Sequence, residues 1–503
     1  MLHAWTASFL GLTALVTLLP GCDARKAGTE SASATVATDS TRDKNRGAIP
    51  ISSASDEARR LYLDGRKLSE QLRAHDAREL YLKAVAADPA FAMAHYQLAL
   101  TSPTAKDFFD HLKQAVALSD KASEGERLTI LALEAGGNAQ PAKALEYVQE
   151  LVAKYPNDER AHFLLGNALN GQQRYDEAVA EYRKATEVNP DFSPAYNSLG
   201  YAYRTLEKFD DAEAAFKKYI ELIPGDPNPY DSYAELLMKT GRFDESIEQY
   251  QKALAVDSNF TPSKVGIATN LMFQGKHAEG AAKMDRLYQT ARDDGDRRTA
   301  LFTKGVILVD AGKTDAALKE IEKEYALDAK LGDAANMSGD ALLLGNILLD
   351  AGRTDAAAKR FWQSLDVVEK SSLSDAVKQD TKLADHYNKG RVALAKGDLV
   401  TAKAEARTYA DGAEARKNSF RTRQAHELLG SIALREKQYD EALDHLGKAN
   451  QQNPQVVYLT ALAWKGKGDA AKAKQYAAKA ANANILPLVA YAFVREEARK
   501  MAS

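Results

Sequence analysis

The chain has 503 residues, of which 45% are hydrophobic and 27% are charged, an ordinary balance for a folded protein. Its 67 Lys and Arg residues nearly cancel its 70 Asp and Glu residues, which leaves a formal net charge of −3. This balance gives no electrostatic basis for binding DNA, RNA or an anionic membrane surface.

Residues 1–21 are predicted to be a secretory signal peptide. Their apolar stretch, residues 9–19, is too short to span a bilayer and is followed by the tetrapeptide LPGC. This tetrapeptide resembles the lipobox of bacterial lipoproteins. The resemblance implies that the chain is cut before Cys22 and that Cys22 carries acyl chains, which would anchor the protein stably. An ordinary signal peptide with an incidental cysteine and an uncleaved anchor are the alternatives.

Residues 22–56 are predicted to be a flexible tether. The stretch is rich in Ser, Thr and Ala, is poor in aromatic residues and shows no period, so it cannot bury a core. From residue 57 onward the sequence predicts helical hairpins, because no segment shows the sustained alternation of a strand.

A 34-residue pattern runs through this helical part. LGNALNGQQRYDEAVAEYRKATEVNP, residues 165–190, is answered 34 residues later by LGYAYRTLEKFDDAEAAFKKYIELIP, residues 199–224. Numbered with the first glycine at position 8, small residues recur at positions 8 and 20, and proline recurs at position 32. The small residues let two helices cross closely, and the proline ends the second helix. These residues are Gly65, Gly166, Gly200, Gly345, Gly390, Gly430, Ala77, Ala178, Ala212, Ala442, Pro89, Pro190, Pro224 and Pro454.

The pattern resembles the tetratricopeptide repeat, and about twelve units follow one another between residues 58 and 487. The resemblance implies an all-α fold, a right-handed superhelical α-solenoid of about twelve helix hairpins. Residues 488–503 resemble a C-terminal capping helix that covers the final apolar face. Extra residues lengthen the later repeats, which divides the array into an N-terminal part, 57–331, and a C-terminal part, 332–487.

The sequence offers no convincing catalytic or metal-binding motif. The segment DAGKTDAAL, residues 310–318, lacks the first glycine of a phosphate-binding loop and follows no predicted strand. Repeats occupy nearly everything after the tether, so we expect no enzyme, no cofactor and no metal. Position 4 of the repeat takes a large ring, so packing is favoured over metal ligation for the histidines found there, His95, His162, His386 and His426.

The concave surface is the predicted binding site. In this family extended peptides or helices lie along the first helix of each hairpin, and the resemblance implies which positions face them. Asn can pair with a peptide main chain, and Tyr offers apolar area with a polar tip. A solvated groove without a ligand is the alternative. The candidate groove residues are Asn167, Asn197, Tyr201, Arg204, Asp231, Glu235, Asn346, Tyr387, Asn388 and Arg391.

Together these features predict a membrane-tethered scaffold of the bacterial cell envelope, facing the periplasm or the exterior. Its groove would bind a peptide or helix of a protein partner to assemble or regulate an envelope complex, and no nucleic acid is expected. The alternative function is that of a regulatory sensor whose solenoid binds a small molecule, which the lengthened repeats favour.

Overall fold

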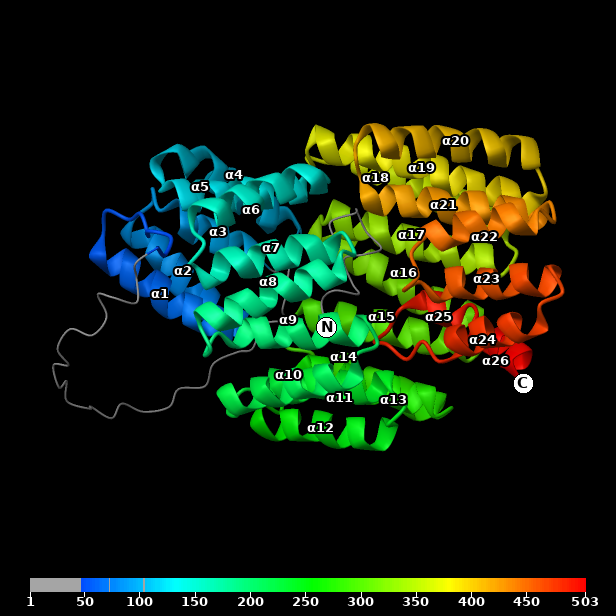
Figure 1. Ribbon diagram of the computed structural model, residues 1–503, viewed down its shortest axis with the longest axis horizontal. Helices are drawn as coiled ribbons and strands as arrows, with labels where there is room; N and C mark the ends of the chain where they lie inside the picture. Colours follow the sequence, from blue (N-terminus) through cyan, green and yellow to red (C-terminus); the bar gives the residue numbers. More distant parts are fainter. Residues whose placement is uncertain (1–46, 72, 103–104) are drawn as a thin grey trace.

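The computed structural model describes residues 47–71, 73–102 and 105–503. The predicted signal peptide, Cys22 and most of the predicted tether lie outside the described residues. Within the described ranges the chain forms 26 α-helices and no strand, and the first 24 helices pair into twelve hairpins (Figure 1). The predicted all-α solenoid of about twelve hairpins is therefore confirmed.

The first six hairpins contain helices of nine to fifteen residues. A 3-10 turn, Ser119–Lys121, precedes the third hairpin. The helices are α1 (Asp56–Glu70) and α2 (Ala74–Ala87), α3 (Ala92–Leu100) and α4 (Ala105–Leu118), α5 (Glu124–Gly137) and α6 (Pro141–Lys154), α7 (Glu159–Gly171) and α8 (Tyr175–Val188), α9 (Ser193–Thr205) and α10 (Phe209–Leu222), and α11 (Pro227–Lys239) and α12 (Phe243–Val256).

The last six hairpins include longer helices, and two short helices follow them. The hairpins are α13 (Thr261–Phe273) and α14 (His277–Gln289), α15 (Asp294–Asp310) and α16 (Thr314–Leu331), α17 (Ala334–Asp350) and α18 (Thr354–Glu369), α19 (Asp375–Lys396) and α20 (Leu399–Ala415), α21 (Ser419–Arg435) and α22 (Tyr439–Lys448), and α23 (Pro454–Gly466) and α24 (Ala470–Ala481). The chain ends with α25 (Val489–Ala492) and α26 (Arg495–Ala502). Helices of 16 to 22 residues run from α15 to α21, so the lengthening begins before residue 332.

Close helix crossing inside each hairpin explains the small residues of the repeat. A Cβ atom added at Gly200 would lie 2.5 Å from Cε1 of Phe216, and one added at Gly166 would lie 2.5 Å from Cε1 of Tyr182. Side chains larger than hydrogen would therefore displace a buried ring. The alanines at position 20 are fully buried at the same crossings, namely Ala77, Ala178, Ala212 and Ala442.

Proline has two roles at position 32. Pro190 and Pro224 follow the ends of α8 and α10, as expected for residues that stop a helix. Pro454 instead occupies the first turn of α23, so its assignment as the end of a second helix is wrong. The reason is that α22 is only ten residues long and stops at Lys448, so the connecting turn is complete before Pro454. A proline at the start of a helix gives up no intrahelical hydrogen bond.

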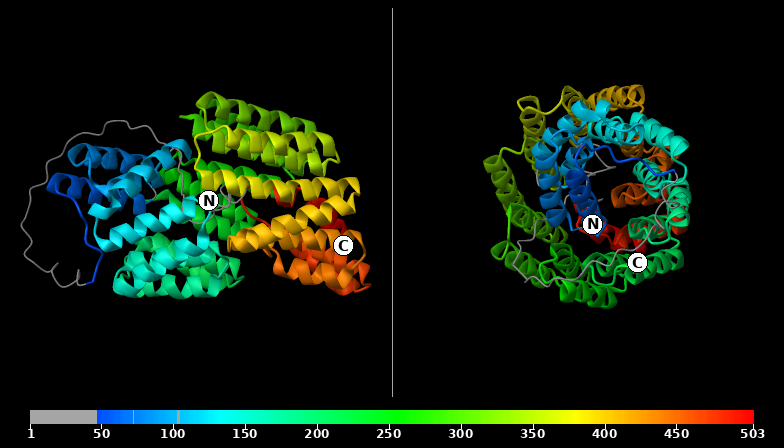
Figure 2. Two further views of the ribbon diagram at one scale, coloured as in Figure 1. Left: turned by 90° about the horizontal axis from the view of Figure 1, so that it is seen from above. Right: turned by 90° about the vertical axis from the view of Figure 1, so that its left-hand side faces the viewer.

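The solenoid coils so tightly that its second turn touches its first. Gln173 Nε2 donates a hydrogen bond to Asn450 Oδ1 at 2.9 Å, and Ser374 Oγ donates one to Asn138 Oδ1 at 2.9 Å. These partners are 277 and 236 residues apart, which corresponds to roughly eight and seven repeats of 34 residues. Seen along the long axis, the helices form a ring (Figure 2).

The C-terminal residues both cap the array and cross to its middle. Helix α26 packs on α24, and its Ala498 is buried against Val457, Ala480 and Ala481, which is the predicted capping contact. The residues just before it, which include α25, pack instead against α15. In the part of the chain that is described, no helix is both long enough and apolar enough to cross a membrane.

The end of the predicted tether lies against the first repeats. The main-chain N–H of Ile49 donates to Asp158 Oδ2 at 2.9 Å, and that of Ala54 donates to Asp88 Oδ2 at 3.1 Å. Between them, the N–H of Ser52 donates to Glu126 Oε1 at 3.0 Å. Residues 49–54 are therefore held by carboxylates of three different repeat units.

Candidate functional site

The concave side of the solenoid encloses a cavity of about 780 Å³, here called the chamber. The first turn contributes walls from α1, α3, α7, α9 and α11, and the second turn contributes walls from α17, α19 and α21. Because both turns form its walls, the chamber is more enclosed than the groove of a single superhelical turn. Residues 483–493 form a further part of its lining.

Nine of the ten predicted groove residues line the chamber, and Asp231 does not. The side chain of Asp231 is only 1% exposed, and its Oδ1 accepts a hydrogen bond from Ser263 Oγ of α13 at 2.7 Å. Burial and the nearby Glu235 carboxylate raise the pKa of Asp231. The assignment of Asp231 to the groove is therefore wrong, because the next repeat covers the position.

On the wall from the first turn, Tyr201, Arg204 and Glu235 form one connected group. Tyr201 Oη donates to Glu235 Oε1 at 2.8 Å, and Arg204 Nη1 donates to Glu235 Oε2 at 3.0 Å. The Arg204 guanidinium also lies over the Tyr201 ring, 4.7 Å from its centre. The buried Glu235 is thus paired within the protein, which leaves the Tyr201 ring and the edge of Arg204 as the groups that a ligand meets.

The wall from the second turn repeats this arrangement with other residues. Tyr387 Oη donates to Glu427 Oε1 at 3.2 Å, and the Arg391 guanidinium lies 5.3 Å from the centre of the Tyr387 ring. Arg391 Nη1 donates to Asn346 Oδ1 at 2.7 Å. Burial raises the pKa of Glu427, while the Arg391 charge opposes that rise. Each wall therefore presents a tyrosine stacked with an arginine above a paired glutamate.

Amide side chains lie between these two groups. Asn167 is engaged with the hairpin, because its Oδ1 accepts a hydrogen bond from Tyr182 Oη at 2.8 Å. By contrast, the side chains of Asn170, Asn197 and Asn388 make no hydrogen bond to another described residue. Asn388 is only 7% exposed, and Oδ1 of Asn197 is buried. A buried amide without a partner has unused hydrogen-bonding capacity that a ligand can satisfy.

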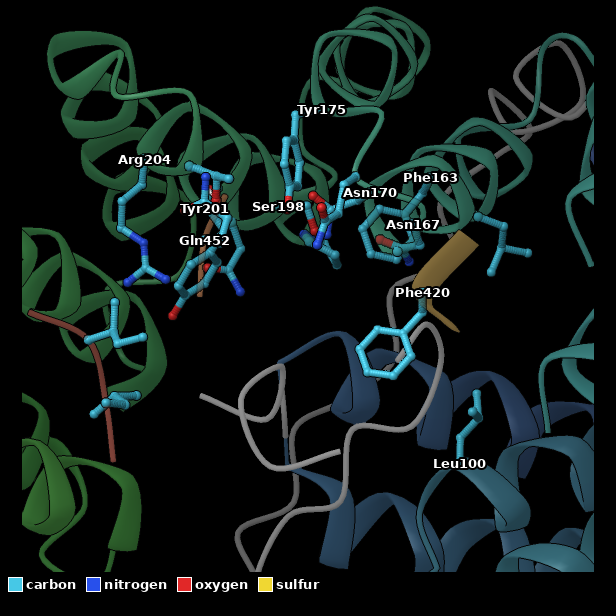
Figure 3. A pocket seen from close by; sticks show the side chains of 18 of the residues that line it. Leu100, Phe163, Asn167, Asn170, Tyr175, Ser198, Tyr201, Arg204, Phe420 and Gln452 are labelled. Carbon is cyan, nitrogen blue, oxygen red and sulfur yellow. Dashed lines mark hydrogen bonds between the residues drawn. The ribbon is translucent and has the colours of Figure 1, made fainter. Parts of the chain in front are cut away.

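Sequence reasoning missed several chamber residues. Figure 3 shows Asn170 and Ser198 in a row with Asn167 and Tyr201, and Phe420 facing them. Phe420 lies near the start of α21, and Gln452 lies in the loop before α23, so neither occupies a concave position of a repeat. They reach the chamber only because the second turn lies against the first, and no local pattern carries that information.

Three of the four histidines at position 4 face hydrogen-bonding partners across their own hairpins, whereas the buried Nδ1 of His95 makes no hydrogen bond to another described residue. His162 Nδ1 lies 2.7 Å from Glu181 Oε2, and His386 Nδ1 lies 2.6 Å from Glu405 Oε2. His426 Nδ1 lies 2.9 Å from His445 Nδ1, so one ring nitrogen donates and the other accepts. Among the residues that the structure covers, no group of three or more His, Cys, Asp or Glu side chains is placed to hold a metal ion.

Comparison with solved structures gives 375 similar chains, of which three serve as examples. MamA residues 41 to the end from Desulfovibrio magneticus RS-1 is 17% identical, with 34% of this chain and 98% of that chain covered and a TM-score of 0.29. YrrB, described as a tetratricopeptide repeat protein with an unusual peptide-binding site, is 18% identical over 37% of this chain and 94% of that one, at a TM-score of 0.25. A tetratricopeptide repeat protein from Parabacteroides merdae ATCC 43184 is 16% identical, with 52% of this chain and 99% of that chain covered and a TM-score of 0.37. At these TM-scores the similarity carries no functional argument.

The sequence itself matches models of one family. Tetratricopeptide repeat models match residues 131–194 and 171–227, and a second such model matches residues 228–260. No curated protein matches the chain. The matched residues extend from α5 to the connection after α12, the part in which the repeat is most regular. Residues 131–260 therefore consist of tetratricopeptide repeats, and the helix hairpins continue on either side of them.

Proposed function

We propose that this protein is a scaffold without catalytic activity that binds an extended segment of a partner protein inside the chamber. Tetratricopeptide repeat proteins mediate protein–protein interactions and are generally not enzymes. The observation that carries the proposal is the set of unpartnered amides, Asn170, Asn197 and Asn388, on facing walls of one enclosed space. A main chain offers alternating donors and acceptors for such amides, and a folded domain is too wide for a space bounded by both turns.

A peptide-display screen against the purified protein tests this proposal. Selected peptides are expected to bind in the chamber, and Asn197→Ala or Asn388→Ala should weaken binding at least tenfold in calorimetry. The matched control is Gln251→Ala, an exposed amide outside the chamber, which should leave the affinity unchanged. Selected peptides whose affinity ignores both chamber substitutions would contradict the proposal.

The envelope location is a second part of the proposal. We propose that Cys22 is acylated and anchors the chain to a membrane of the bacterial cell envelope, with the solenoid facing the periplasm or the exterior. The support is the LPGC tetrapeptide after an apolar stretch. Cells fed with radioactive palmitate should label the wild-type chain, and equal labelling of Cys22→Ala would refute the anchor.

A small-molecule sensor remains the second candidate function. Its support is the enclosed volume of about 780 Å³, which falls within the usual range for small-molecule pockets, roughly 300–1,000 Å³. A metabolite library read by thermal unfolding separates the two candidates. A metabolite that raises the melting temperature of the wild type, but not that of Asn388→Ala, combined with a peptide screen that yields no binder, would favour the sensor.

A further inference from the structure

The concave face of α13 and α15 differs from the rest of the concave surface. Where α7, α9 and α19 present amides and tyrosines, this face presents Val265, Met272 and Phe273 on α13 and Phe302 and Val306 on α15. The positions of Phe273, Phe302 and Val306 would lie exposed in an open groove, whereas the position of Val265 is the one that the next repeat covers at Asp231. Here most of them are buried in one apolar cluster, so something covers them.

The cover is the chain's own C-terminal segment, residues 485–495, here called the latch. Leu486, Val489 and Tyr491 of the latch are buried in the same apolar cluster as Phe273 and Val306. The Tyr491 and Phe273 rings lie 5.5 Å apart, and α25 packs against α15. The latch therefore occupies the surface that the neighbouring repeats leave free for a ligand.

The latch also forms part of the chamber. Ile485, Leu488 and Phe493 line the cavity, together with the amides and tyrosines of the other walls. One side of the segment is thus buried on α13 and α15, and its other side faces the enclosed space. If the latch leaves its place, the chamber loses a wall and the two turns lose a contact.

One buried charge makes the latch contact imperfect. Arg495 is only 3% exposed, and none of its three guanidinium nitrogens makes a hydrogen bond. Its guanidinium carbon lies over both the Phe273 and Tyr491 rings, 4.1 and 4.5 Å from their centres, and its Nη1 lies 3.5 Å from Asp310 Oδ1. Burying a cation without hydrogen bonds costs free energy that the apolar contacts of the latch must offset. The contact is therefore weaker than an apolar core of the same area.

Two of the contacts between the two turns are polar and at least partly exposed, whereas Phe109 of α4 packs on an apolar cluster of α17, α18 and α19. Lys479 Nζ lies 3.2 Å from Glu207 Oε1, and both side chains are about half exposed. Arg423 donates to the main-chain oxygen of Gln172. Exposed ion pairs contribute little to stability. Such contacts can separate once the latch is released.

We propose that the latch is a built-in occupant of the concave face of α13 and α15, and that its release opens the chamber to the partner's segment. This proposal rests on the proposed function only in one respect, namely that the molecule that enters the opened chamber is a segment of a partner protein. Its structural part, an intramolecular segment that competes with an external copy of itself, stands without any partner.

The test uses a fluorescent synthetic peptide that corresponds to residues 484–496, added to the full chain. In the wild type the tethered latch competes at a high effective concentration, so the peptide should bind poorly. Val489→Asp places a charge in the buried contact and should raise the affinity for the peptide at least tenfold. The matched control is Val400→Asp, at a side chain that is 82% exposed, which should bind the peptide as poorly as the wild type.

Two outcomes overturn the latch. The first is equal binding of the peptide to the wild type and to Val489→Asp while the helical circular dichroism of the variant is unchanged. If Val489→Asp loses its helical signal, Tyr491→Ala is measured in the same assay instead. The second outcome that overturns the latch is then equal binding of the peptide to the wild type and to Tyr491→Ala. Deleting the segment is avoided because α26 caps the last hairpin.

A separate measurement tests whether release of the latch opens the chamber. A chamber-binding peptide from the display screen should associate at least tenfold faster with Val489→Asp than with the wild type. Equal association rates would overturn the gating role and leave the proposed function standing. Failure of any peptide to enter the chamber of either protein would overturn the proposed function, while binding of the 484–496 peptide would still report on the latch.

Discussion

Two neighbouring regions of this solenoid are built from similar helix hairpins but differ in what their concave faces contact. In α7–α12 the first helices present Asn197, Tyr201 and Arg204 to an enclosed space. In α13–α16 the corresponding face presents Phe273 and Val306, and the latch covers it. The positions that join two helices are alike in both regions, whereas the concave positions differ. The concave residues therefore decide whether a stretch of the solenoid faces the chamber or packs against the latch.

The strongest test of this difference replaces one phenylalanine in each region. Phe273→Ala removes a buried ring that contacts both Phe243 and the latch, so we expect a loss of about 3–5 kcal/mol in the free energy of unfolding. Phe163→Ala, in the chamber wall, removes a ring that is only partly buried, and should cost less than half as much. Guanidinium chloride unfolding measures both, and equal losses would show that the two faces are packed alike.

The sequence predicts the hairpins well because their contacts are local. Gly166 meets Tyr182 only 16 residues later, and the repeat states both partners in every unit. The chamber depends on contacts such as that between Gln173 and Asn450, which are 277 residues apart. The small rotation between adjacent repeats, summed over many units, sets those contacts, and no single unit encodes that sum.

The candidate groove residues illustrate the same limit. Position in the repeat assigned Asn197 and Asn388 to the concave side, and both line the chamber although they come from different turns. It failed for Asp231, which α13 covers through Ser263. The repeat pattern also does not predict that residues 485–493 leave the last repeat and pack against α15. In sequence, an apolar tail that caps the last hairpin looks the same as one that packs on an earlier repeat.

A second test compares the helix crossings of the two regions. At Gly200 an added Cβ would lie 2.5 Å from a ring carbon of Phe216, whereas at Gly305 it would lie 2.6 Å from the terminal Cδ1 of Ile321. A methyl group at the end of a flexible side chain moves aside more easily than a packed ring. We therefore expect Gly200→Ala to cost about 1–3 kcal/mol, and Gly305→Ala to cost less. Thermal unfolding of both variants, with exposed Lys217→Leu as a silent control, measures the difference.

A third test uses pH on the cap of α11. Burial raises the pKa of Asp226 to about 6, well above its ordinary value of 3.8, so the folded protein binds a proton there more tightly than the unfolded chain does. Its stabilising contribution is complete below pH 4 and is lost as the pH rises through 6. Asp226→Asn should keep the cap on Asn228 and flatten the stability profile between pH 4 and 6, with a gain of about 1–2 kcal/mol at pH 7.

The control for this test is Asp226→Ala, which removes the cap itself. It should cost about 1 kcal/mol relative to Asp226→Asn at every pH. Urea unfolding from pH 3.5 to 8 separates the two effects. A wild-type profile that rises between pH 4 and 6 faster than that of Asp226→Asn would reverse the sign and contradict the assigned cause.

The smallest expected change in stability is the most informative about the chamber. Asn346 accepts a hydrogen bond from Arg391, so Asn346→Ala leaves a partly buried guanidinium with one partner fewer and should cost about 1–3 kcal/mol. Asn388 makes no hydrogen bond to another described residue, so Asn388→Ala should change the free energy of unfolding by less than about 0.5 kcal/mol. Chemical denaturation of both variants gives the comparison. If Asn388→Ala costs as much free energy of unfolding as Asn346→Ala, the fold rather than a ligand requires this amide. If Asn388→Ala leaves the free energy of unfolding unchanged but abolishes peptide binding, the ligand contacts the second turn as well as the first.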